Sequence, residues 1–410
     1  DGMSAGTLTL ADIAIRQTTG QRCAWMRLWD RPGVRRALQD TASADSLVTD
    51  SSAAASAWGI GERINNGAVN FTPDNREPEP ILVTARAHAK ATGLVTTTRV
   101  THATPAGFIA SVPSRDMEGP IAQQIMQRGV DVVLGGGRQF FPQATLDLRD
   151  HTLATDAAAL AAAPATLARP LLGLFSAGHI DYILDRPDTQ PTLEAMTRAA
   201  LARLDRADNG FVLQVEGGRI DHAAHSNDAA ALITEQMEFD RTIQVVADFC
   251  QDRDDTLVII TSDHGNANPG LTLYGRDAAR GMERLLAARL SLETILTRVE
   301  AGGTGPGALD RLTASIAEHR GIELADREKR FLLAQAERQP TNPFAEQCNW
   351  TSLLGGLLAN FYGVAFISPN HTADHVELAA FGPGSQAIPA TVLNTDLHRI
   401  MIEALDLVPA

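Results

Sequence analysis

The chain has 410 residues, of which 44% are hydrophobic and 20% charged, a balance typical of a folded protein with a large buried core. Lys and Arg number 35 against 49 for Asp and Glu, and the formal net charge of −14 argues against a nucleic-acid backbone or an anionic membrane as the main partner. No stretch reaches the ~20 apolar residues of a membrane span, and the odd number of cysteines (Cys23, Cys250 and Cys348) allows at most one disulfide.

Short apolar runs alternate with longer amphipathic runs along the chain, which is the pattern of an α/β fold. We expect a doubly wound, mainly parallel central sheet flanked by helices. The expected strands are Ser46–Thr49 (the weakest), Gly93–Val100, Val130–Leu134, Gly210–Val215, Thr256–Thr261 and Val376–Phe381. The expected helices are Ser52–Ile64, Pro120–Arg128, Thr192–Asp205, Ala229–Cys250 and Thr391–Leu405.

The pattern changes between Pro269 and Pro369. Two long segments, Asp277–Ala301 and Leu309–Arg338, have helical periodicity and are separated by a glycine-rich linker. We therefore expect residues 1–268 and 369–410 to form the α/β core, and residues 269–368 to form a largely helical insertion beside the active site.

Acidic and histidine side chains follow three expected strands. Glu216 follows Val215, Asp263 and His264 follow Thr261, and Asp50 follows Thr49. In open α/β sheets, ligands bind outside the carboxyl ends of the strands. These groups are therefore candidates for one shared site.

Several side chains in these segments are of the types that bind metal ions. Asp221 and His225 are four residues apart and share one face of a helix, although a helix start with solvent-facing histidines would have the same pattern. Asp263 and His264 could converge on a metal if the chain turns sharply after its strand. In the segment 370–375, either of the two histidines could be a ligand, or the segment could be a simple loop.

Ser51 precedes a helix rich in small residues and stands where an N-cap belongs. Amides at a helix N-terminus favour an anion, such as a serine alkoxide or a phosphate, but a capped helix alone would have the same sequence. No His-Asp pair is placed beside Ser51 in the manner of a hydrolase triad, so a nucleophilic Ser51 would need a metal to activate it. Thr104 offers a hydroxyl to a hard cation, and Arg115 offers a guanidinium to phosphate oxygens.

In this order and spacing, the segments resemble the motifs of the alkaline phosphatase family. Asp1-Gly2-Met3 is similar to its first metal motif, Asp50-Ser51 to its nucleophile motif, and His102-Ala103-Thr104 to its magnesium-site loop. Arg115 lies at the spacing of the phosphate-binding arginine. The resemblance covers most of the chain outside residues 269–368.

The resemblance implies two zinc sites and one magnesium site. The first zinc set is Asp221, His225 and His371, the second is Asp1, Asp263 and His264, and the magnesium set is Asp1, Thr104 and Glu216. Ser51 would become phosphoserine and Arg115 would bind the phosphate oxygens. Three further residues, Asp50, His102 and His222, would stand behind these groups and tune them.

The implied activity is hydrolysis of phosphate monoesters to an alcohol and inorganic phosphate, with a rate that rises into the alkaline range. A sulfatase would need Cys/Ser-x-Pro-x-Arg, whereas Ser51 is followed by Ser-Ala-Ala. A phosphodiesterase of the same superfamily is an alternative, which the implied third metal site at Thr104 and Glu216 disfavours. A non-catalytic metal- or phosphate-binding homologue is the other alternative, but no implied ligand, nucleophile or arginine is replaced.

The resemblance also implies a hydrophobic strand before the first metal-binding aspartate. We therefore expect the natural chain to extend upstream of Asp1, with that strand and an export signal, and the protein to be periplasmic or secreted. Homodimerisation is an expectation that comes from the resemblance alone.

Overall fold

A five-stranded parallel sheet forms one half of the central layer of the protein. The computed structural model describes residues 1–141, 150–303, 307–336 and 349–407. The strand order is β4 (Thr152–Ala154), β5 (Leu171–Leu174), β3 (Val132–Gly136), β2 (Ala91–Arg99) and β6 (Phe211–Glu216). All four pairings are parallel, as the sequence pattern predicts.

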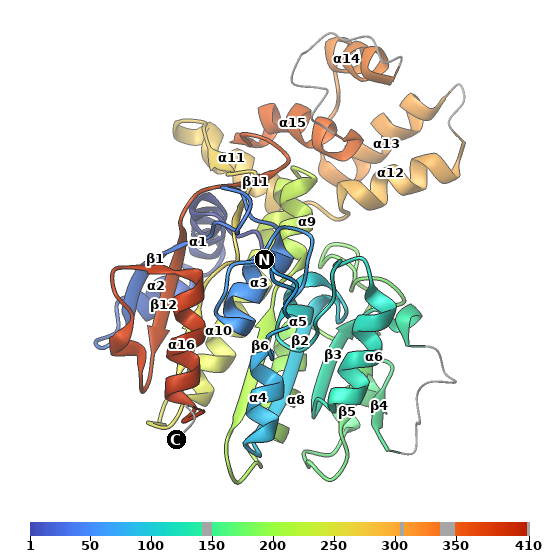
Figure 1. The fold of residues 1–410 in the computed structure, drawn as a ribbon. Helices are drawn as coiled ribbons and strands as arrows, with labels where there is room; N and C mark the ends of the chain where they lie inside the picture. The colour runs from blue at the N-terminus through green and yellow to red at the C-terminus, as the bar shows by residue number, and fades with distance from the viewer. Residues whose placement is uncertain (142–149, 304–306, 337–348, 408–410) are drawn as a thin grey trace.

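A second, mixed sheet lies on the other side of β6 (Figure 1). Its order is β13 (Thr391–Leu393), β1 (Arg35–Asp40), β12 (Val376–Phe381) and β7 (Val258–Ile260). Among the described residues, β6 pairs only with β2 and β7 only with β12. Both strands line a cavity of about 480 Å³, which explains why alternate residues of β6 are only half-buried in the middle of the fold.

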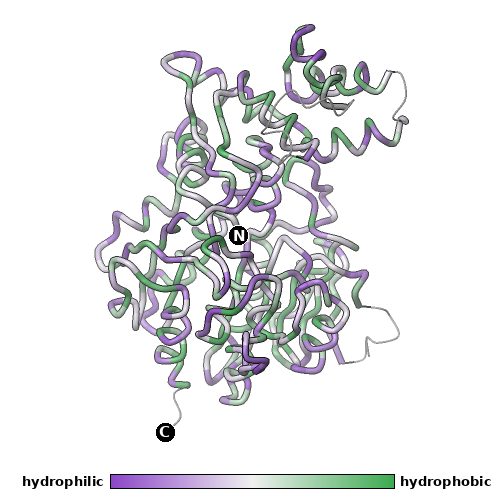
Figure 2. Tube along the Cα trace, turned by 45° about the horizontal axis from the view of Figure 1, so that its top comes forward, coloured by the Kyte–Doolittle hydropathy of each residue, from purple (hydrophilic) through white to green (hydrophobic). Residues whose placement is uncertain are grey.

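Helices cover both faces of the parallel sheet, which confirms the doubly wound α/β fold. On β2, Leu94 packs with Ile81 of α4 (Ile81–Ala87) and Ile121 of α6 (Glu118–Arg128). The next residue, Val95, points to the opposite face and packs with Met196 of α8 (Leu193–Leu204). Hydrophobic segments accordingly run through the interior of the tube in Figure 2, with hydrophilic segments along its outer turns.

Of the remaining core elements, the longest are the helices α1 (Ala5–Thr19), α10 (Ala229–Phe249) and α16 (Asn394–Ala404). The shorter helices are α2 (Ala24–Trp29), α3 (Ser51–Ile60), α5 (Ala103–Gly107), α7 (Ala157–Ala162) and α9 (Arg219–His225), with single turns η1 (Arg138–Phe140) and η3 (Ser385–Ala387). The two-residue strands are β8 (Gly265–Asn266), β9 (Gly270–Leu271), β10 (Val364–Ala365) and β11 (His371–Thr372). No described helix combines the length and apolar character that crossing a membrane requires.

The described residues between 275 and 362 form five helices, which lie above the carboxyl ends of the strands in Figure 1. They are α11 (Gly275–Leu286), α12 (Leu292–Ala301), α13 (Ala308–Arg320), α14 (Asp326–Ala336) and α15 (Trp350–Tyr362). Their apolar faces share one hydrophobic cluster with residues of α1 and α10. We call these five helices the helical cap; its division from the core at residues 269 and 368 stays a prediction.

Several expected elements differ from those observed. The expected strand Ser46–Thr49 is wrong: these residues form a loop, because the side chain of Asn66 donates to the Val48 carbonyl (3.0 Å) and the Ser46 carbonyl accepts from the Ser43 amide (3.1 Å). Residues 391–393 pair with β1 as a strand, so α16 begins only at Asn394.

Glycine and serine residues end or divide three of the other expected helices. Gly61 ends α3 in the left-handed conformation (φ 72°), and Gly321 ends α13 in the same way (φ 62°). Ser291 caps a new helix inside the expected 277–301 segment. The last two residues of the expected helix 309–338 lie outside the described residues.

Cys23 and Cys250 are buried thiols without a disulfide in the described part of the chain. Burial raises the pKa of Cys23 to about 12 and that of Cys250 to about 11. Cys348 lies outside the described residues, so the expected limit of one disulfide stays a prediction.

Candidate metal and phosphate site

Four segments from distant parts of the sequence meet at the carboxyl end of β6. The amide of Gly2 donates to Asp263 Oδ1 (3.0 Å), and the amide of Met3 donates to Ser262 Oγ (2.8 Å). β11 pairs with β8 and places His371 opposite Asn266. Asp1, Glu216, His264 and His371 are thereby brought to one place, as the strand-end rule predicts.

Gly2 is required for this convergence. It has a φ of 68°, and a Cβ atom there would lie 2.6 Å from Asp221 Oδ1. Any larger residue would be strained and would push Asp221 away.

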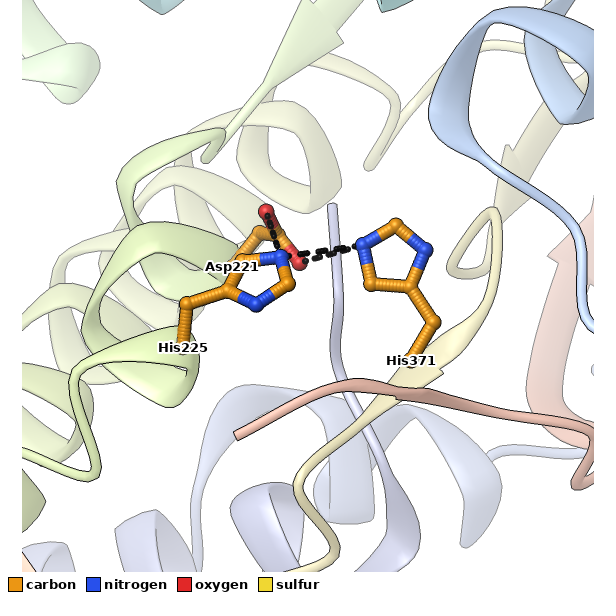
Figure 3. Close-up of side chains that lie close together, drawn as sticks. All are labelled: Asp221, His225 and His371. Carbon is orange, nitrogen blue, oxygen red and sulfur yellow. Dashed lines mark hydrogen bonds and ion pairs between the residues drawn. The ribbon is translucent and has the colours of Figure 1, made fainter. Parts of the chain in front are cut away.

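Asp221, His225 and His371 form the first donor cluster (Figure 3). Their ligand atoms lie within 4.8 Å of one another. His225 Nε2 is 3.3 Å from Asp221 Oδ2, His371 Nε2 is 3.6 Å from Asp221 Oδ1, and the two Nε2 atoms are 3.0 Å apart. α9 places Asp221 and His225 on one face, as their four-residue spacing predicts.

Backbone carbonyls orient both histidine rings. His225 Nδ1 lies 2.6 Å from the Pro369 carbonyl and His371 Nδ1 lies 2.9 Å from the Thr49 carbonyl. A carbonyl can only accept, so each Nδ1 carries a proton and each neutral ring presents its Nε2 lone pair to the other ring. Two facing lone pairs need a cation between them, either a proton or a metal ion.

The pKa values of the two rings indicate that, without a metal, the pair holds one proton between about pH 4 and pH 9. Burial opposes charge on His225, but the Asp221 carboxylate outweighs it and raises the pKa of His225 to about 9. Burial and the neighbouring His264 lower the pKa of His371 to about 4. The pKa of Asp221 lies well below its usual value despite its burial, because three histidines surround it.

Asp1, Asp221 and His264 form the second donor cluster, with ligand atoms within 4.8 Å of one another. Asp263 Oδ2 lies 3.1 Å from His264 Nε2, so this expected ligand borders the second donor cluster. Within the described part of the chain, both Asp1 carboxylate oxygens and Asp263 Oδ2 are buried without a hydrogen-bond partner. Leaving such groups unpaired is costly, so they fit cation binding.

Asp1, His102 and Glu216 form the third donor cluster, again within 4.8 Å. Among the described residues, Glu216 Oε1, the hydroxyl of Thr104 and His102 Nδ1 are buried without partners. Glu216 Oε2 accepts from the Thr96 hydroxyl (2.5 Å), and burial raises the pKa of Glu216. His102, expected to stand behind the ligands, lies among the donor groups themselves.

Ser51 is the first residue of α3, and the preceding Asp50 is the N-cap, which corrects the expectation that Ser51 caps the helix. Asp50 Oδ1 accepts from the Ala53 amide (2.9 Å). Ser51 is only 2% exposed, and its Oγ lies 3.3 Å from His264 Nε2. The nucleophile candidate thus borders the second donor cluster at a helix N-terminus.

His264 and Asp263 lie beside Ser51 in the fold, but not in the manner of a hydrolase triad. Their geometry is not that of a serine hydrolase triad, in which the carboxylate binds Nδ1 and the serine binds Nε2. Here Asp263 Oδ2 and Ser51 Oγ both approach Nε2 of His264. His264 Nδ1 has no partner among the described residues, so the histidine cannot act as the relay of a triad.

Arg115 reaches the mouth of the site beside Ser51. Its Nη1 donates to Asp50 Oδ2 (2.9 Å), and its Nη2 lies 3.4 Å from His102 Nε2. Arg115 is among the groups that hold the pKa of Asp50 below its usual value, against the effect of burial. Asp50 therefore joins the cap of the nucleophile helix to the guanidinium.

His222 belongs to a group of three histidines behind Arg115. Its ring centroid is 5.5 Å from that of His102 and 4.4 Å from that of His179, a residue that sequence reasoning missed. Burial and nearby arginines lower the pKa of all three histidines; that of His102 falls to about 3. His179 follows β5, and recognising Leu171–Leu174 as a strand would have found it by the strand-end rule.

Comparison with known proteins gives the family. The family model described as alkaline phosphatase matches residues 1–160 and 149–407. The chain belongs to the alkaline phosphatase family. It is 29% identical to alkaline phosphatase 4 of Bacillus subtilis over 88% of this chain and 77% of that protein, and 33% identical to the streptomycin-6-phosphate phosphatase of Streptomyces griseus over 67% and 71%.

Solved structures agree with this assignment. The crystal structure of Thermus thermophilus alkaline phosphatase matches with a TM-score of 0.89 and 31% identity, covering 100% of this chain and 90% of that one. A cold-active alkaline phosphatase from Shewanella matches with a TM-score of 0.82 and 25% identity, covering 100% and 98%. The family assignment makes the chain a phosphatase of the hydrolase class.

Proposed function

We propose that this chain hydrolyses phosphate monoesters to an alcohol and inorganic phosphate through a phosphoserine on Ser51. The observation that carries the proposal is the place of Ser51. Its hydroxyl lies at the N-terminus of α3 and 3.3 Å from His264, near a guanidinium and near buried carboxylate oxygens that have no hydrogen-bond partner among the described residues. This arrangement fits a nucleophile whose alkoxide and phosphate are held by positive charge.

The donor clusters fit two zinc ions and one magnesium ion. Asp221, His225 and His371 would hold one zinc, and Asp1, Asp263 and His264 the other. Asp1, Thr104 and Glu216 would hold magnesium, with His102 close enough to join them. When bound, these ions supply positive charge to an attacking oxygen and a leaving oxygen.

The chain's own residues account for the rest of the proposed reaction. Ser51 Oγ attacks phosphorus in line with the departing alcohol, and water later attacks the phosphoserine in the same way. Arg115, held by Asp50, binds two nonbridging phosphate oxygens. Because phosphoryl transfer needs positioning and charge more than covalent help, this fixed guanidinium favours transfer.

The third cluster favours monoesters over diesters. A cation held by the donor cluster of Asp1, His102 and Glu216 would add positive charge to the site, which a dianionic phosphate needs more than a diester does. A diester carries one negative charge less and a second organic group. The phosphodiesterase alternative therefore has less support than the monoesterase.

The test compares the wild type with Ser51→Ala on p-nitrophenyl phosphate and bis-p-nitrophenyl phosphate, with metal content measured in both proteins. We expect monoester turnover that rises into the alkaline range, stops with a chelator and collapses in the variant. Mass spectrometry of acid-quenched wild type should find one phosphoryl group on Ser51. Equal turnover of both proteins, or faster diester hydrolysis, would contradict the proposal.

We further propose that the protein is exported, to the periplasm or the medium, and that it forms a homodimer. Its relatives include bacterial alkaline phosphatases, and both proposals rest on family membership. Fractionation of cells that express the full natural gene, and light scattering of the purified protein, would test them.

A further inference from the structure

The segment 226–228 directly follows His225 and is enclosed by the helical cap. Asn227 has a left-handed backbone (φ 48°) and is 7% exposed. Gly355 of α15 packs so closely on it that a Cβ there would lie 2.3 Å from the Asn227 carbonyl oxygen. His225 is the last residue of α9. The position of segment 226–228 therefore affects where the His225 side chain lies.

Asp228 joins this segment to two helices of the cap. Its carboxylate forms a bidentate pair with Arg320 at the end of α13, at 3.0 and 2.7 Å. Asp228 Oδ2 also accepts from the Leu292 amide at the start of α12 (2.7 Å), and Oδ1 accepts from the Ala231 amide (3.3 Å). Both side chains of the ion pair are at most 2% exposed, so the carboxylate is held on every side.

A second link joins the end of α9 to the segment that follows the cap. The Asn227 amide group, with its nitrogen turned toward the two carbonyls, donates to Ala224 and Ser368 at 3.0 Å each. The next residue, Pro369, accepts from His225 Nδ1 (2.6 Å), and His371 lies two residues further on. The segment that follows the cap therefore contacts His225 and leads directly to His371.

We propose that Arg320 and Asp228 are positioning residues for the first donor cluster and that the helical cap holds His225 in place through them. The proposal rests on the proposed zinc site of Asp221, His225 and His371. Neither Arg320 nor Asp228 contacts the ligand atoms. Their pair fixes the end of α9, so the His225 side chain loses less conformational entropy when a metal binds.

A purely structural role for the pair predicts a different result. If Arg320 only stabilised the cap, its replacement would lower the free energy of unfolding without separating the two proposed zinc sites. If it positions His225, its replacement weakens the site that contains His225 and leaves the Asp1, Asp263 and His264 site unchanged. Mutation of a residue that supports a metal ligand without binding the metal typically lowers metal affinity by about 10- to 100-fold.

The experiment measures zinc retained per chain in buffers of fixed free zinc, together with the visible absorption of the cobalt-substituted protein. The variants are Arg320→Met and Arg320→Lys, the second of which keeps the charge but not the bidentate geometry. The matched control is Arg311→Lys on the same helix, whose guanidinium donates to the Gly303 carbonyl of the cap. Circular dichroism verifies that each zinc-free variant is folded.

We expect Arg320→Met to lose one zinc per chain at about 10- to 100-fold higher free zinc than the wild type, with an altered cobalt spectrum. Arg320→Lys should fall between them and Arg311→Lys should match the wild type. Wild-type zinc retention in folded Arg320→Lys and Arg320→Met, or joint loss of both zinc ions, would overturn the inference. A wild type that retains zinc but does not hydrolyse monoesters would contradict only the proposed function.

Discussion

His225 and His371 face each other with their Nε2 atoms 3.0 Å apart, and each ring is fixed from behind by a backbone carbonyl. The Pro369 and Thr49 carbonyls leave neither ring free to turn its other nitrogen forward. The pair therefore binds one cation at a time, a proton or a metal ion. This competition makes metal binding depend on pH.

We predict that zinc binds the metal-free protein more tightly as pH rises, until the pKa of His225 is passed. That pKa is about 9 without metal, so the proton on His225 competes with zinc below pH 9. Asp221 is ionised throughout this range, because its pKa is well below its usual value. One displaced proton corresponds to an apparent affinity that rises about tenfold per pH unit and levels off above about pH 9.

Competition titrations with a chelator at several pH values, corrected for the chelator's own protonation, measure this dependence. Exchanging His225 for Ala removes the competing proton, so the variant should bind weakly with a much flatter pH dependence. An apparent affinity for the wild type that is constant between about pH 7 and 9 would contradict the prediction.

A second prediction concerns Asp50, which supports both the nucleophile helix and Arg115. Asp50→Ala removes the N-cap and should lower the free energy of unfolding by about 1–2 kcal/mol. It also releases Arg115, so we expect inorganic phosphate to bind several-fold more weakly. Asp50→Asn keeps an oxygen for the Ala53 amide, and should lose phosphate affinity with a smaller loss of stability.

Urea unfolding and calorimetric titration with phosphate separate the two effects in metal-loaded protein. Asp45→Asn is a suitable control, since Asp45 accepts from the Asn66 amide in the same loop region but does not contact Arg115. Equal phosphate affinity in Asp50→Ala and wild type would show that Arg115 does not depend on this ion pair.

The sequence predicts those parts of the site that depend on local spacing. The i, i+4 pair of Asp221 and His225 and the strand-end position of Glu216 follow from helix and strand periodicity. The α/β fold with a mainly parallel sheet also follows, because short apolar runs alternate with longer amphipathic runs along the chain. These are features that a few neighbouring residues determine.

Features that depend on tertiary contacts could not be predicted. β1 has three charged residues and one uncharged polar residue among its six, and it forms a strand because β12 and β13 flank it. His179 enters the site through the short strand β5, which has little sequence signal. The cap of α3 by Asp50 instead of Ser51 depends on the further partners Gly67 and Arg115, which lie far along the chain.

A third prediction concerns Thr96, whose hydroxyl orients Glu216 in the third donor cluster. Thr96→Val keeps the shape of the side chain but removes the 2.5 Å hydrogen bond to Glu216 Oε2. We expect magnesium to bind about tenfold more weakly, with zinc retention unchanged. Thr92→Val, on the same strand but beside Asp131, is the matched control and should bind magnesium as the wild type does. Magnesium and zinc bound per chain, measured after dialysis at graded magnesium concentrations, test this prediction. Equal magnesium binding by Thr96→Val and the wild type would contradict it.

A fourth prediction concerns Glu235, a buried carboxyl that is not among the candidate metal ligands. Burial and the nearby Glu238 outweigh the attraction of Arg186 and raise the pKa of Glu235 to about 7. In the unfolded chain the same carboxyl has a pKa of about 4.3. Because the folded-state pKa is the higher one, its contribution to stability is complete below about pH 4.3 and is lost as pH rises through about 7.

Glu235→Gln should therefore stabilise the protein in alkaline solution. The amide oxygen can still accept from the Ile183 amide, which donates to Glu235 at 2.6 Å, while Glu238 alone remains to pair with Arg186 at 2.6 Å. We expect a gain of about 1–3 kcal/mol in the free energy of unfolding at pH 9 and little change at pH 5. Urea unfolding of metal-loaded protein at both pH values measures this difference, with the exposed Glu283→Gln as control. A variant that is equally destabilised at both pH values would show that Glu235 is ionised and needed by Arg186 throughout this range.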